Sequence, residues 1–151
     1  MLLDINTKDR LLALCIGIKE ESAANIQAAM DDAQQSANEY GSPKDRYDSF
    51  RAQLMRKRDM LAQQLAQTEE ELRFLRQIKP GVISKRVEPG SLVALNSQIL
   101  YVLLGIGKVT IDGVTVYVVS PVVPLVESMK NLKSGDSFSF RGQNMTIKEI
   151  V

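Results

Sequence analysis

A heptad seam between residues 54 and 75 limits the folds open to this chain more than any other feature. Its members recur with spacings that alternate between four and three residues: Leu54, Arg58, Leu61, Leu65, Thr68, Leu72 and Leu75. This period keeps them on one face of an α-helix for about four heptads. A helix that carries such an apolar stripe needs a second surface to cover it.

The preceding segment is predicted to form the covering helix. A similar stripe runs through it: Leu11, Leu14, Ile18, Ser22, Asn25, Ala29 and Ser36. Thr7 is expected to cap its start, with Asp9 favourable in its first turn. Gly41 can end this helix, and Ser42 with Pro43 can begin the next one. Because this connection is short, we expect an antiparallel helical hairpin.

The composition changes near Lys79. Helix-forming residues dominate before it and β-branched residues after it, which predicts a helical domain at 1–78 and a β-rich domain at 82–151. Asp112-Gly113 is a typical hairpin turn. The predicted fold class is therefore α+β, a coiled-coil hairpin followed by a small antiparallel sheet. The expected strands are 91–95, 99–105, 108–111, 114–119, 137–140 and 145–150, with a short helix at 125–132.

The residue types that are missing exclude several kinds of chemistry. The chain has no histidine and a single cysteine, so histidine-based catalysis and the common zinc sites are excluded. Cys15 lies among apolar residues and is expected to be buried. Neither a signal peptide nor an apolar run long enough to cross a membrane is evident, and the net charge is only +1. These features favour a cytoplasmic protein that binds no membrane.

Charged residues gather around the expected hairpin tip. Asp45 and Asp48 are three residues apart, so they share one face of the second helix. They can stabilise the start of that helix through its dipole, or they can help to hold a divalent metal ion. Lys44, Arg46 and Arg51 can form a solvated face, or they can contact phosphates or an acidic protein surface.

The order of motifs in the second half resembles that of a known family. The relevant residues are Ser120-Pro121, Pro124-Leu125, Leu132, Ser134-Gly135-Asp136, Gly142 and Ile147. Together with the predicted hairpin, this order resembles the bacterial Gre transcript-cleavage factors, which are transcription elongation factors. The resemblance implies a coiled-coil hairpin followed by an FKBP-like domain. It also implies a monomer that binds RNA polymerase, with its hairpin in the secondary channel and its tip near the active centre.

The resemblance assigns roles to the tip residues. In the family, acids at the tip help to hold a second Mg²⁺ of the polymerase, which then cleaves backtracked RNA. Asp45 and Asp48 match two of these acids, and Asp45 is the implied Mg²⁺ ligand. Ser42 replaces a further acid and Arg46 replaces an asparagine, which implies that cleavage stimulation is weak or lost. Lys44, Arg46 and Arg51 are then expected to contact the polymerase or the nascent RNA 3′ end.

These implications make the chain a regulator without enzymatic activity or a cofactor of its own. Two other classes of function stay open. A coiled-coil adaptor or chaperone-like module with no polymerase role predicts a homodimer through the 54–75 seam. A self-contained hydrolase or isomerase is the third possibility, and the absence of histidine argues against it.

Overall fold

The computed structural model describes residues 3–39 and 45–151, and of residues 45–48 only the backbone. Contacts group the chain into two compact units, Ile16–Arg76 and Met1–Cys15 with Gln77–Val151. This grouping does not measure independent folding, so the predicted domains 1–78 and 82–151 stay a prediction. No helix of the described ranges is both long and apolar enough to span a membrane.

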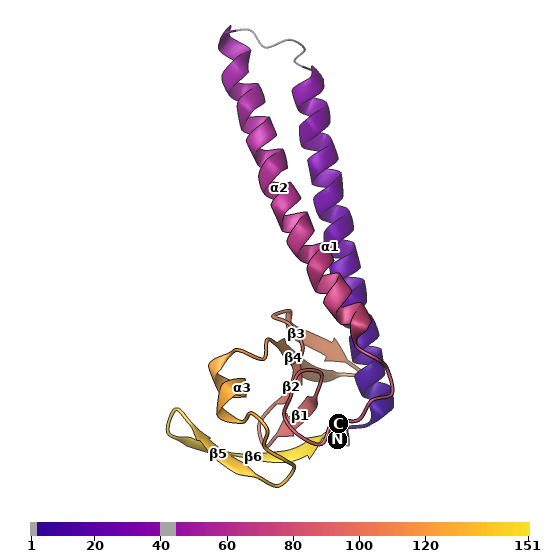
Figure 1. The fold of residues 1–151 in the computed structure, drawn as a ribbon, viewed down its shortest axis with the longest axis vertical. Coiled ribbons are helices and arrows are strands. Elements are labelled where there is room, and N and C mark those ends of the chain that lie inside the picture. Colours follow the sequence, from indigo (N-terminus) through magenta and orange to yellow (C-terminus); the bar gives the residue numbers. More distant parts are fainter. Residues whose placement is uncertain (1–2, 40–44) are drawn as a thin grey trace. The chain divides into compact units, whose positions relative to one another are not determined.

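The unit Ile16–Arg76 consists of most of two long helices, which run side by side (Figure 1). They are α1 (Ile5–Glu39) and α2 (Asp45–Gln77). Lys19 Nζ lies 3.2 Å from a carboxylate oxygen of Glu71, and Arg58 donates to Gln34 Oε1 over 2.5 Å. Residue 19 pairs with residue 71 and residue 34 with residue 58, so later residues of α1 meet earlier residues of α2. The two helices are therefore antiparallel. The predicted helical hairpin is confirmed.

The predicted seam of α2 is confirmed as the face it buries. Thr68, Leu72 and Leu75 are buried, with Leu75 fully enclosed at 0% exposure. The seam residues from Leu54 to Leu65 are half-buried. Thr68 donates its hydroxyl to the carbonyl of Gln64 over 2.9 Å, so this polar side chain is satisfied inside the apolar seam.

The stripe predicted on α1 is correct in part, since Leu11 is fully buried and Ser22, Ala29 and Ser36 are half-buried. Leu14 and Ile18 were expected to face α2, but they are 39% and 37% exposed. The helix instead buries residues with smaller side chains, among them Cys15, Ala33 and Ala37. These small side chains contribute little apolar area to the contact between the two helices.

The start of α1 also differs from the prediction. Thr7 lies inside the helix, and its backbone N–H donates to Asp4 Oδ1 over 2.7 Å. Asp4 is therefore the N-cap, and this hydrogen bond lowers the pKa of its carboxyl. Asp9 does not act in the first turn. Its carboxylate accepts the backbone N–H of Gly81 at 3.0 and 3.1 Å.

The second unit contains a six-stranded sheet in the order β3-β4-β2-β1-β6-β5. The strands are β1 (Leu92–Leu95), β2 (Ile99–Val102), β3 (Gly107–Ile111), β4 (Val114–Val119), β5 (Ser137–Phe140) and β6 (Gln143–Ile150). The antiparallel prediction holds for most neighbours but fails for β2 and β4, which pair in parallel. The β3–β4 hairpin brings its second strand against β2, which makes the sheet mixed.

Two tight turns and one short helix complete this unit. Asp112 and Gly113 both have positive φ angles, 50° and 75°, as a primed hairpin turn requires. Arg141 and Gly142 repeat this geometry, with φ angles of 51° and 78°, between β5 and β6. The predicted helix 125–132 is shorter than expected, since α3 spans Pro124–Ser128. The apolar core comprises Val87, Val93, Leu95, Leu100, Val102, Val126, Met129 and Ile147.

The seam predicts where the hairpin is sensitive to truncation. Leu72→Ala should lower the free energy of unfolding by about 2–4 kcal/mol, because Leu72 is only 5% exposed and its loss leaves a cavity. Met60→Ala on the same helix is the matched control. Met60 is 55% exposed, so the effect should stay within about 0.5 kcal/mol. Urea denaturation measures both, and equal losses would contradict the assigned seam.

Because the thiol of Cys15 is buried, we expect the free energy of unfolding to fall at alkaline pH. Burial raises the pKa of the thiol from 9.0 to about 11. Between these values the unfolded chain releases the proton that the folded chain keeps, so stability is complete below pH 9.0 and falls as pH rises to about 11. The loss should approach about 2–3 kcal/mol. Denaturation of the wild type and of Cys15→Ala across this range should show a steeper decline in the wild type, and parallel curves would refute this assignment.

Candidate functional site

The hairpin tip carries most of the residues that the sequence singled out. Ser42 and Lys44 lie outside the described residues. Asp45, Arg46 and Asp48 lie in the first turn of α2, where only the backbone is described. Their helical placement fits the predicted spacing. Whether Asp45 and Asp48 converge on a metal ion stays a prediction.

Arg51 is the one predicted contact residue whose side chain is described. It lies about two turns into α2 and is half-buried. Its Nε is buried and has no hydrogen-bond partner among the described residues. Within the described part of the chain, this Nε is therefore an unpaired donor in the second turn of α2.

Polar contacts and small side chains hold the hairpin between the tip and its middle. Arg58 sits in the seam, where it donates to Gln34 and forms an ion pair with Asp59 at 2.8 Å. Ala33 and Ala37, which are close to Gln34 in the sequence of α1, are buried, with exposures of 4% and 0%. Small side chains contribute little apolar area when they are buried. This part of the hairpin is therefore weakly stabilised by burial.

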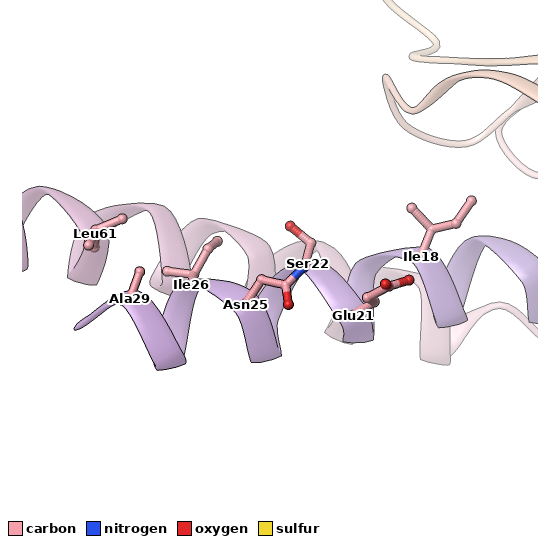
Figure 2. Close-up of a pocket in the computed structure, with 7 residues that line it drawn as sticks. All are labelled: Ile18, Glu21, Ser22, Asn25, Ile26, Ala29 and Leu61. Atoms are coloured by element: carbon pink, nitrogen blue, oxygen red, sulfur yellow. The ribbon is translucent and has the colours of Figure 1, made fainter. Parts of the chain in front are cut away.

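A groove of about 380 Å³ runs along the middle of the hairpin (Figure 2). Its walls come from both helices: Ile18, Glu21, Ser22, Asn25, Ile26 and Ala29 of α1, with Leu61 of α2. Ile18, Ser22, Asn25 and Ala29 belong to the stripe predicted on α1, and Leu61 belongs to the seam of α2. The groove offers one carboxylate, a hydroxyl and an amide, which is no arrangement for acid–base or nucleophilic chemistry.

The sequence reasoning missed a buried lysine in the other unit. Lys8 is only 5% exposed, and its ammonium donates to the carbonyl of Val82 over 2.9 Å. Burial lowers its pKa. One signal was available in the sequence, since Lys8, Leu12 and Cys15 follow helical spacing on one face. Among residues with described side chains, no cluster of three or more carboxylate, cysteine or histidine groups could hold a metal ion.

Comparison with solved structures finds chains of similar architecture. One is the GreA factor homolog 1 (Gfh1) protein of Thermus thermophilus, with 15% identity, a TM-score of 0.34, and coverage of 95% of this chain and 94% of that one. A structure described as the transcription factor Gfh1 gives 14% identity, a TM-score of 0.36, and coverage of 89% and 92%. Gfh1 of Thermus aquaticus gives 15%, 0.33, and 89% and 92%. Likeness at this level carries no functional argument.

No protein-family profile matches the chain, and no curated protein matches it in sequence.

Proposed function

We propose that this chain is a Gre-like transcription elongation regulator that binds RNA polymerase through its secondary channel. The observation that carries this proposal is a long antiparallel pair of helices followed by a small mixed sheet, with charged residues in the sequence at the start of α2. This is the arrangement that the motif order in the sequence had led us to expect. The protein acts in the cytoplasm as a monomer, and any catalysis belongs to the polymerase.

The dimensions of the hairpin suit a probe. Its helices contain 35 and 33 residues. At 1.5 Å per residue the shorter one is about 50 Å long. A two-helix hairpin of this length can carry a few groups into a deep channel, which a compact domain of the same mass cannot.

The charges at the tip suit modulation better than strong cleavage. Mg²⁺ prefers oxygen ligands, and carboxylates offset its charge. Asp45 is the proposed ligand of the polymerase's second Mg²⁺, with Asp48 one turn further along. Ser42 supplies no negative charge. Lys44, Arg46 and Arg51 are proposed to contact the polymerase or the RNA 3′ end, and they weaken the local negative potential.

The adaptor alternative makes a different use of the seam. It needs the 54–75 stripe to pair between two chains. In the structure, α1 of the same chain lies along α2, and the ion pairs Lys19–Glu71 and Glu20–Arg76 join them at 3.2 and 3.1 Å. The stripe therefore has a neighbouring helix within the same chain, which supports the monomer over the adaptor.

The tip residues give the first functional test, which is RNA shortening in a backtracked polymerase complex at fixed Mg²⁺. The wild type should stimulate cleavage weakly or not at all. Ser42→Asp should raise the rate, because it adds a carboxylate while keeping a good helix cap. In that background Asp45→Ala should lower the rate by at least about tenfold, a loss typical even for groups one shell away from a metal.

Glu69→Ala is the matched control, since it removes an exposed carboxylate from the same helix far from the tip. It should leave the cleavage rate unchanged, both in the wild type and in the Ser42→Asp variant. All these variants should bind polymerase as the wild type does. Cleavage that survives Asp45→Ala would remove this residue from the proposed site, and a chain that fails to bind polymerase would overturn the proposed function as a whole.

The length of the hairpin gives a second test. Deleting residues 27–33 and 59–65 removes one heptad from each helix and keeps the Lys19–Glu71 and Gln34–Arg58 pairs in register. The hairpin becomes about 10 Å shorter. Polymerase binding should change little, whereas the effect on the active centre should be lost.

Circular dichroism establishes that the shortened chain stays helical, and a polymerase pull-down measures its binding. If the short chain regulates transcription as well as the full chain does, the tip does not act at the active centre.

A further inference from the structure

The unit formed by residues 1–15 and 77–151 contains a cavity of about 290 Å³ that the proposed function does not use. Its walls combine charged and apolar groups, among them Lys8, Asp9, Glu88, Tyr101, Leu12 and Val82. Small-molecule sites have this character, with apolar walls and a few polar groups that fix orientation. The volume suits a small metabolite.

Lys8 brings a positive charge to this cavity. Its Nζ donates to Val82 O over 2.9 Å and makes a long contact of 3.5 Å with Ser84 Oγ. An ammonium has three donors. The third has no hydrogen-bond partner among the described residues. Because Lys8 lines the cavity, this donor is available to a group held there.

Tyr101 adds a second donor to the same cavity. The residue is only 1% exposed, and it lines the cavity. Burial is the main cause that raises its pKa, so the hydroxyl keeps its proton. Lys8 and Tyr101 both line the cavity, so each can donate a hydrogen bond to a group held there.

Negative groups line the cavity as well. Both Asp9 and Glu88 raise the pKa of Lys8 through their charges, against the larger effect of burial, so they lie near its ammonium. Asp9 already accepts the Gly81 N–H, while the carboxylate of Glu88 has no hydrogen bond within the described part of the chain. Lys79 also lines the cavity, which therefore holds two positive and two negative side chains. A purely anionic ligand such as phosphate would be repelled by the two carboxylates.

We propose that this cavity binds a small zwitterionic metabolite of the amino-acid class. The ligand carboxylate accepts hydrogen bonds from Lys8 Nζ and the Tyr101 hydroxyl. The ligand ammonium pairs with the carboxylate of Glu88. A short aliphatic body packs against Leu12 and Val82. This site is independent of polymerase binding.

Calorimetric titration of the full-length chain tests the proposal with glycine, L-alanine and L-leucine at millimolar concentrations. Two analogues of leucine separate the charges, since 4-methylpentanoate lacks the ammonium and 3-methylbutylamine lacks the carboxylate. At least one amino acid should bind, and neither analogue should bind comparably. An absence of binding by all three amino acids overturns the site, and equal binding of an analogue overturns the zwitterionic class.

Matched variants locate the binding. Tyr101→Phe removes only a hydroxyl and should weaken binding at least about tenfold, the scale of a hydrogen bond to a charged group. Tyr117→Phe makes the same change at an exposed tyrosine and should have no effect. Glu88→Gln should also weaken binding, in contrast to Glu127→Gln on α3.

Lys8→Met is less decisive, because it also removes the contact with Val82 and so disturbs the fold. Unchanged affinity in Tyr101→Phe and Glu88→Gln would place the ligand elsewhere and reject the site.

Discussion

The apolar stripe on α2 has to be covered along a helix of 33 residues, and the way it is covered shapes the rest of the hairpin. Thr68, Leu72 and Leu75 are buried, whereas the seam residues before them are half-buried. Burial of apolar area is the main source of stabilisation. Stability is therefore concentrated toward the end of α2. The outer part relies on small side chains and on the contact between Arg58 and Gln34, which fixes register more than it adds stability.

Helix α1 serves both compact units, because its residues up to Cys15 belong with the sheet and the later ones with α2. Three consecutive residues fix its first turns. Lys8 and Asp9 bind the backbone of residues 81–82, and Arg10 holds Asp112 through two hydrogen bonds of 2.6 and 3.0 Å. Consecutive helical residues point about 100° apart, so each of the three reaches a different place. Polar contacts of three neighbouring side chains therefore fix the first turns of α1 against residues 81–82 and Asp112.

Periodicity predicted the elements whose signal was strong and local. The seam of α2 and the Asp112-Gly113 turn follow directly from spacing and turn chemistry. The stripe on α1 was misplaced in part: Leu14 was included and is exposed, while Ala37 was left out and is buried. The parallel pairing of β2 with β4 was missed, since strand partners far apart in sequence leave no local pattern.

The sequence predicted the residues of the hairpin tip but not the buried lysine of the cavity. Tip residues were chosen by charge and spacing together with a family resemblance, and the side chains of residues 45–48 lie outside the structural description. Lys8 was missed for a physical reason. A lysine on an apolar face usually extends its stem and keeps its ammonium in water. Here the Val82 carbonyl accepts a hydrogen bond from the ammonium, and only the folded chain shows that this partner is near.

Charge balance at the tip limits what the proposed regulator can do. Between residues 44 and 51 the sequence places three basic side chains against two acidic ones. A second Mg²⁺ needs negative charge around it before it can lower the pKa of a bound water. Two carboxylates offset by three cations supply little of it. The same cations favour contact with RNA phosphates or acidic protein surfaces. A tip of this composition is therefore better suited to occupying a channel and contacting its contents than to driving hydrolysis there.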